Sequence, residues 1–288
     1  MAFPCALKYH PVLSICAASV LSLGACADIP SRTGHANEIS QKNRLHRHDI
    51  STQMFQLASW QKLTAPEGPI HLYIEGDGLA WLSRSTPSKN PTPKEAVALE
   101  LAANDPAPNV VYLARPCQYT DFDLPHNNCH RDYWTGKRFS QEVLESYHSA
   151  LNQLEKDYKR GFHLIGYSGG ANIAGLLAAR REDILSLRTV AGNVDNDFFT
   201  RFHNVSDMPY SLNMADYAES LSALPQYHFI AENDAFVPPP VFESYAGKAG
   251  SSACIRAEIV KGTEHIKGWA TRWRDLLKRT PACLPGKN

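Results

Sequence analysis

From about residue 53 to the C-terminus, short apolar segments alternate with longer segments whose apolar residues recur every three or four positions. The short segments are rich in β-branched and aromatic residues and predict strands, whereas the longer ones predict amphipathic helices. The expected strands cover residues 55–62, 70–75, 109–114, 161–166, 187–191, 226–231 and 254–260. Strands that alternate with helices predict one α/β domain, with a mostly parallel central sheet and helices on both faces.

Two of the expected helices have recognisable N-terminal signals. Thr92-Pro93-Lys94-Glu95 has the pattern of a capping box and is expected to open a helix that ends near Ala103. Ser140 can cap a longer helix that runs to about Tyr158. The remaining expected helices cover residues 170–181, 214–223, 239–246 and 268–279.

The N-terminal part of the chain has a different pattern. Val12 to Ala25 contains no charged residue and follows Lys8, which is the layout of a secretory signal that is too short to span a membrane. The segment after it, residues 27–50, is polar and shows no sustained period. We therefore divide the chain into a signal peptide (1–25), a flexible tether (26–52) and an α/β domain (53–288).

Composition narrows the possible partners and cofactors. Of 288 residues, 29 are Lys or Arg and 29 are Asp or Glu, so the chain lacks the net positive charge that favours nucleic-acid binding. No Walker A, G-x-G-x-x-G or H-E-x-x-H pattern occurs, and we expect neither a cofactor nor a metal. His126, Cys129 and His130 lie close together, but their spacing matches no familiar zinc framework.

The cysteines indicate an oxidising compartment. Seven are present; Cys5 and Cys16 fall in the signal segment and Cys26 falls at its end. An even number in the remainder of an exported chain predicts two disulfides, for which three pairings are possible. We favour the pairs that close a short polar loop and tie the C-terminal tail to a late strand, Cys117–Cys129 and Cys254–Cys283.

The apolar segment ends in Leu23-Gly24-Ala25-Cys26, which resembles the lipobox of bacterial lipoproteins. In that family the cysteine becomes the first residue after cleavage and carries diacylglycerol, so the resemblance implies lipidation of Cys26 and a membrane as partner. Ala27 stands where Asp would resemble an inner-membrane retention signal, which favours the outer membrane of a bacterial cell envelope. The alternative is an ordinary signal peptide cut near Ala25 or Ala27.

A possible nucleophile lies at Gly166-Tyr167-Ser168-Gly169-Gly170, a G-x-S-x-G sequence between an expected strand and a helix rich in small residues. A nucleophile elbow requires this strand-to-helix context, because it exposes the serine at a sharp turn. The alternative is a glycine-rich turn that carries an ordinary serine.

The elbow predicts that an acid and then a histidine follow in the chain, each after a strand. Asp234 follows the expected strand 226–231, and His265 is the one histidine beyond the last expected strand. Asp195 lies after strand 187–191 and is the competing candidate for the acid; its alternative role is to cap a helix or stabilise a turn.

A third requirement is a pair of backbone donors for an oxyanion. Strand 70–75 ends in Glu75-Gly76-Asp77-Gly78, so the amide of Asp77 or Gly78 is expected to act beside that of Gly169. A simple tight turn is the alternative interpretation of this glycine-bearing segment.

With these motifs, residues 55–283 resemble the α/β-hydrolase superfamily, and the whole chain resembles bacterial lipoproteins that carry such a domain. The resemblance implies Ser168 as nucleophile, His265 as general base and acid, and Asp234 as the carboxylate that orients the imidazole. We expect a membrane-tethered serine hydrolase that acts on a small ester or related acyl substrate, with a carboxylesterase favoured. A noncatalytic binding or structural lipoprotein with the same fold is the alternative.

Two long connections, 115–139 and 192–224, follow strand ends and are expected to shape a pocket. The first contains four aromatic residues that either line a cleft or pack beneath the loop: Tyr119, Phe122, Tyr133 and Trp134.

Overall fold

The computed structural model describes residues 29–284. The expected signal peptide and Cys26 lie outside the described residues. Within the described part of the chain, no helix combines the length and the hydropathy that a membrane span requires.

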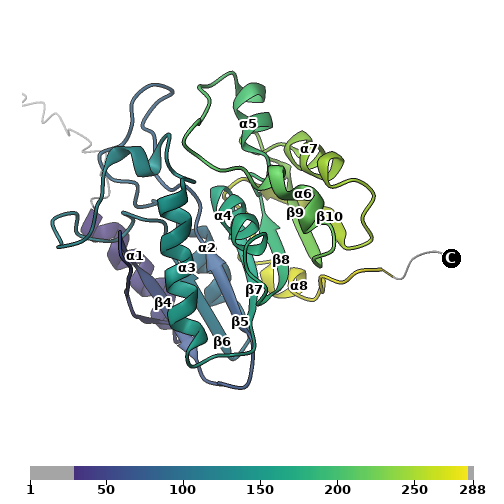
Figure 1. Cartoon of the computed structure of the whole chain (residues 1–288). Coiled ribbons are helices and arrows are strands. Elements are labelled where there is room, and N and C mark those ends of the chain that lie inside the picture. The colour runs from purple at the N-terminus through teal and green to yellow at the C-terminus, as the bar shows by residue number, and fades with distance from the viewer. Residues whose placement is uncertain (1–28, 285–288) are drawn as a thin grey trace, which may run out of the picture.

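An eight-stranded sheet forms the centre of the molecule, in the order β1-β4-β6-β5-β7-β8-β9-β10 (Figure 1). Strands β1 and β4 pair antiparallel, as do β4 and β6, and the strands from β6 to β10 are parallel. The strands are β1 (His46–Arg47), β4 (Ser59–Leu63), β5 (Ile70–Ile74), β6 (Asn109–Leu113), β7 (Phe162–Tyr167), β8 (Ile184–Val190), β9 (Gln226–Asn233) and β10 (Ile255–Glu264). Two further strands, β2 (Ile50–Ser51) and β3 (Gln56–Leu57), pair separately.

Helices cover both faces of this sheet (Figure 1). One face carries α3 (Gln141–Glu155), α4 (Gly169–Ala178), α6 (Ala218–Leu221) and α7 (Pro239–Ala249). The other face carries α1 (Ile29–Lys42), α2 (Val97–Ala103) and α8 (Trp273–Leu276). Helix α5 (Asn196–His203) and two short 3-10 helices, η1 (Arg131–Trp134) and η2 (Met214–Tyr217), lie in the connections. This architecture confirms the predicted α/β fold class.

The alternation of side chains along β5 shows how the two layers share the sheet. Ile70, Leu72 and Ile74 are buried on the side of α3 and α4, whereas Tyr73 is buried on the side of α2 and α8. Since both faces of a central parallel strand are covered, β5 has apolar residues on both faces and is interrupted only by His71, which explains why the central strands were recognisable.

Residues 29–51 are folded, which corrects the expectation of a flexible tether over 26–52. Helix α1 packs through Ala36, and its Asn37 side chain accepts a hydrogen bond of 3.1 Å from the indole of Trp60. His46 then pairs with Gln61 at the edge of the sheet. The buried stripe of α1 consists of small or polar residues, so the sequence shows no apolar period there.

Both predicted disulfides are present: Cys117 is bonded to Cys129 and Cys254 to Cys283. The first closes the polar loop in the connection between β6 and α3. Because its sulfur is bonded to Cys117, Cys129 is not available as a thiolate ligand for a metal.

The capping box expected at residues 92–95 does not begin a helix. Helix α2 starts at Val97, and the Thr92 hydroxyl instead accepts a hydrogen bond of 2.9 Å from the Tyr119 amide. The buried carboxylate of Glu75, at the end of β5, accepts from the Ala98 amide at 3.4 Å. A residue distant in sequence therefore caps α2, and local sequence could not show this.

Glu75 has a carboxyl group that is costly to ionise. Burial raises its pKa to about 7, even though hydrogen bonds from the Gly76 and Ala98 amides and the Tyr112 hydroxyl favour the carboxylate. The native state therefore binds a proton at this site more tightly than the unfolded state does.

This shift predicts a pH-dependent stability. The contribution of Glu75 to the free energy of unfolding is greatest below pH 4.5. It falls by an amount on the order of 3 kcal/mol as the pH rises through about 7. Urea unfolding between pH 5 and 8 should show a steeper fall in the free energy of unfolding for the native protein than for Glu75→Gln. Parallel pH profiles for the two proteins would contradict this assignment.

Candidate active site

Ser168 lies at the sharp turn between β7 and α4, where its φ of 50° and ψ of −121° are unusual for an L residue. The turn leaves little space beside it: a Cβ placed on Gly166 would lie 2.4 Å from the Ala171 Cα. The small residues of the G-x-S-x-G sequence thus allow the strand and helix to approach closely, and the serine is presented at the apex.

The structure brings Ser168, His265 and Asp234 together. His265 Nε2 lies 3.0 Å from Ser168 Oγ, and His265 Nδ1 lies 2.8 Å from Asp234 Oδ2. An ionised carboxylate only accepts hydrogen bonds, so we assign the donated proton to Nδ1, which leaves Nε2 free to accept from the serine hydroxyl. This is the arrangement in which an imidazole can act as a base toward a serine.

The acid and the base are each held by further contacts. The other oxygen of Asp234 accepts hydrogen bonds of 2.8 Å from the amides of both Phe236 and Val237, and its side chain is fully buried. The carbonyl of His265 accepts from the Tyr167 hydroxyl and from the Trp269 indole, each at 3.1 Å. These contacts fix the positions of the loops after β9 and β10 relative to Ser168.

Asp195, the competing candidate for the acid, lies in a separate network. Its buried carboxylate accepts from the Phe198 amide as the N-cap of α5, and from Ser244 at 2.7 Å and Lys248 at 2.9 Å. Burial tends to raise the pKa of Asp195, but the hydrogen bonds led by that of Lys248 outweigh it and hold the pKa below its usual value. The geometry therefore pairs His265 with Asp234, while Asp195 joins α5 to α7.

The turn after β5 that contains the expected oxyanion donors packs against the turn of the serine, and a Cβ on Gly76 would lie 3.1 Å from the Ser168 Cβ. Gly169 is the first residue of α4, so its amide has no acceptor within the helix. A Cβ on Gly169 would lie 2.1 Å from Asp77 Oδ1, which shows how closely the turn after β5 approaches. The Gly76 amide donates to Glu75, whereas the amides of Asp77 and Gly78 have no acceptor among residues 29–284.

Sequence reasoning missed two arginines that hold Asp77. Arg115 Nη1 lies 2.9 Å from Asp77 Oδ1, and Arg138 Nε lies 3.0 Å from Oδ2. Arg115 also donates to the carbonyl of Arg138, and both guanidinium groups stack on the ring of Phe139. Arg115 lies two residues after the end of β6, so the rule that parallel strands end at one edge could have placed it near Asp77.

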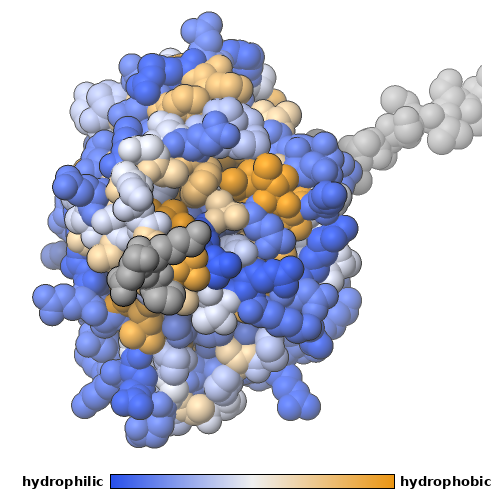
Figure 2. Space-filling view, turned by 90° about the vertical axis from the view of Figure 1, so that its right-hand side faces the viewer, coloured by the Kyte–Doolittle hydropathy of each residue, from blue (hydrophilic) through white to orange (hydrophobic). Residues whose placement is uncertain are grey.

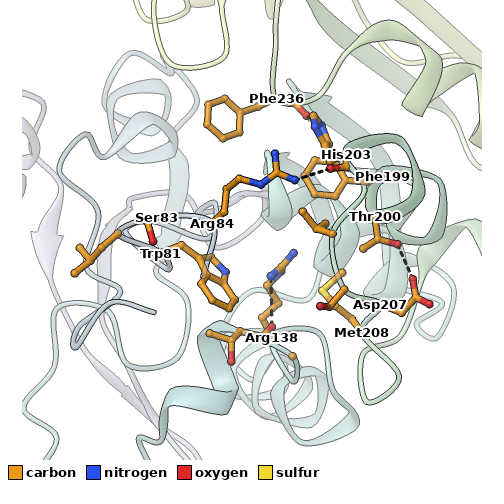
Figure 3. Close-up of a pocket in the computed structure, with 15 residues that line it drawn as sticks. Trp81, Ser83, Arg84, Arg138, Phe199, Thr200, His203, Asp207, Met208 and Phe236 are labelled. Atoms are coloured by element: carbon orange, nitrogen blue, oxygen red, sulfur yellow. Dashed lines mark hydrogen bonds between the residues drawn. The ribbon is translucent and has the colours of Figure 1, made fainter. Parts of the chain in front are cut away.

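A cavity of about 620 Å³ lies next to this cluster (Figure 3). The connection 192–224 contributes part of its wall, as expected, but the loop 81–84 also contributes and was not anticipated. The aromatic residues singled out in 115–139 pack instead of lining this cavity: Tyr119 against Trp60, Phe122 against Trp134 and Tyr133 against Phe55.

Exposed apolar side chains flank the histidine. Phe236 is 65% exposed and its ring centre lies 5.4 Å from that of His265, while the neighbouring Ile266 is 47% exposed. On the side of the molecule that Figure 2 shows, hydrophobic residues form small patches on a mostly hydrophilic surface.

One group of side chains within residues 29–284 has the spacing of a metal site. The ligand atoms of His35, Glu95 and Glu100 lie within 4.8 Å of one another. These groups take no part in the contacts that join Ser168, His265 and Asp234, and we assign them no role.

Comparison with known proteins identifies the fold. No protein-family profile matches the chain, and no curated protein matches it in sequence. Solved structures do match, among them an esterase from Pyrococcus furiosus, with a TM-score of 0.59 and 12% identity over 84% of this chain and 94% of that one.

Two further structures match to a similar degree. Est1E from Butyrivibrio proteoclasticus has a TM-score of 0.56 and 12% identity, over 81% of this chain and 96% of its own. An alpha-beta serine hydrolase homologue from Coxiella burnetii has a TM-score of 0.53 and 16% identity, over 81% of this chain and 93% of its own. The chain therefore has the α/β-hydrolase fold, as its motifs predicted.

Proposed function

We propose that the protein is a serine hydrolase, and specifically a carboxylesterase, with Ser168, His265 and Asp234 as its catalytic triad. The observation that carries this proposal is the continuous hydrogen-bonded chain from Asp234 through His265 to Ser168. The fold adds support, because the nucleophile follows β7, the acid follows β9 and the histidine lies at the end of β10, the order typical of α/β-hydrolases.

In this mechanism His265 Nε2 takes the proton of Ser168 as Oγ attacks the ester carbonyl. The negative charge of the tetrahedral intermediate is stabilised by the Gly169 amide and by the amide of Asp77 or Gly78. His265 then gives its proton to the departing alcohol, and an acyl group remains on Ser168. Water attacks this acyl-enzyme by the same steps, which releases the acid and restores the serine.

The size of the cavity and the named relatives favour small esters. A volume of about 620 Å³ lies within the range of small-molecule sites. The structural neighbour from Pyrococcus furiosus is described as an esterase, and another neighbour is an acylaminoacyl peptidase from Pyrococcus horikoshii. Ester cleavage is the simplest reaction that the proposed triad supports.

The triad can be tested with purified protein and a short-chain aryl ester. Ser168→Ala and His265→Ala should each lower kcat on the order of 10⁴-fold, and the double variant should lose little more because the residues act as a unit. Asp234→Asn should lose somewhat less. Asp195→Asn is the matched control, and it should keep most of the activity because its carboxylate contacts α5 and α7 rather than His265.

Two results would reject parts of this proposal. Full activity in Ser168→Ala would exclude the serine mechanism, and loss in Asp195→Asn without loss in Asp234→Asn would move the acid to the earlier loop. No hydrolysis by the correctly folded native protein, over a panel of acyl chain lengths, would favour a noncatalytic binding role.

We further propose that the protein is anchored to the membrane, with the outer membrane of a bacterial envelope favoured. The support is the apolar sequence that ends in Leu23-Gly24-Ala25-Cys26. Acyl chains contribute about 0.8 kcal/mol per buried CH₂ group, so several on Cys26 would give a lasting anchor.

The anchor predicts a change in processing and partitioning. Cys26→Ser should give either a soluble product or an unprocessed precursor, whereas the native protein should enter the detergent phase of a phase-separation assay. Unchanged partitioning and molecular mass in the variant would overturn the lipid anchor.

A further inference from the structure

The cavity beside the triad contains more positive charge than its surroundings neutralise. Arg84 and Arg138 both line it, and their side chains project toward its middle from opposite walls (Figure 3). Behind Arg138, a third arginine, Arg115, shares with it the single carboxylate of Asp77. The cluster of Arg115, Arg138 and Asp77 thus carries one positive charge in excess.

Arg138 has unused hydrogen-bonding capacity although it is only 9% exposed. Its Nε faces Asp77 without hydrogen-bond geometry, its Nη1 donates weakly to the Thr135 carbonyl at 3.5 Å, and its Nη2 has no acceptor within residues 29–284. Burial lowers the pKa of Arg138, and Asp77 opposes this effect only in part because Arg115 adds to it. A buried guanidinium whose charge is only partly compensated, and whose N–H groups are not all hydrogen-bonded, would be stabilised by a further anion.

Arg84 faces Arg138 without a carboxylate of its own. Its Nη2 donates to the main-chain carbonyls of His203 at 3.2 Å and Asn204 at 3.4 Å. These neutral acceptors hold the side chain across the cavity but leave its charge uncompensated. Among residues 29–284, Asp207 contributes the one carboxylate of the lining; it is exposed and accepts a hydrogen bond from the Thr200 hydroxyl at 3.2 Å.

The remaining lining is largely apolar and touches the triad. Trp81, Phe199, Met208 and Phe236 contribute to the walls, and Phe236 lies against His265. On the other side, Arg138 binds Asp77, whose carboxylate lies against Gly169. The cavity therefore borders the surroundings of Ser168 on two sides, through Phe236 and through Arg138.

We propose that the cavity binds a carboxylate at the far end of the substrate's acyl chain, held by Arg84 and Arg138. The preferred substrates are then esters of dicarboxylic acids in which one carboxyl group is free. This inference rests on the proposed function, since it specifies the substrate of the same site. A planar guanidinium binds a carboxylate through two parallel hydrogen bonds, and the apolar walls suit the methylene chain between the two ends.

Two esters of equal chain length test the inference: an aryl hexanoate and the corresponding aryl monoadipate, corrected for spontaneous hydrolysis. We expect kcat/KM for the monoadipate to exceed that for the hexanoate about tenfold, the size of one charge-assisted hydrogen bond. Arg84→Gln and Arg138→Gln should each lower this ratio at least fivefold. Arg201→Gln is the control; it removes the same charge from the exposed surface of α5, outside the cavity, and should leave both rates unchanged.

The preference in the native protein should also weaken as ionic strength rises, because salt screens the two arginines. If Arg138→Gln does not fold, the dependence on ionic strength and the Arg84→Gln variant still test the carboxylate site. Equal rates for the two esters, or a ratio that Arg84→Gln leaves intact, would overturn the carboxylate site while leaving the hydrolase proposal in place.

If neither ester is hydrolysed, the proposed function fails. Thermal unfolding in the presence of the free acids then tests whether the cavity binds a carboxylate. Free adipate should raise the Tm of the native protein more than hexanoate does, and Arg84→Gln should abolish the difference. The same Tm shift with both acids would overturn the site independently of catalysis.

Discussion

The close approach of two backbone turns determines the rest of the site. Ser168 is held at a φ of 50°, a conformation that costs an L residue about 1–3 kcal/mol, and the tight packing of β7, α4 and the turn after β5 maintains it. The same packing brings the turn that contains Asp77 and Gly78 against Gly169. Backbone geometry therefore positions both the proposed nucleophile and the turn that contains the proposed oxyanion donors.

This close approach brings the negative charge of Asp77 next to Gly169, and two arginines compensate that charge. The carboxylate of Asp77 lies against Gly169, where it would repel the negative charge that forms in the proposed reaction. Arg115 and Arg138 bind both of its oxygens and leave the cluster with a net positive charge. The charge arrangement thus favours an oxyanion on one side and, through Arg138, a substrate carboxylate on the other.

The sequence predicted those features that depend on period, chain order or local motif. The central strands were evident because they are apolar on both faces, and the elbow at Ser168 predicted the order in which Asp234 and His265 would follow. Helix α1 was missed because Ala36 and the polar Ser40 form its buried stripe, and the start of α2 because Glu75, distant in sequence, caps it. The pairing of Asp77 with Arg138 depends on loop conformation, which no periodic pattern encodes.

The proposed function depends on the activation of Ser168 as a nucleophile by His265. Labelling with a fluorophosphonate probe, followed by peptide mass spectrometry, tests it without a choice of ester substrate. We expect one adduct, on the peptide that contains Ser168, formed rapidly in the native protein and very slowly in His265→Ala. An adduct on another residue, or equally fast labelling of Ser168 without His265, would contradict it.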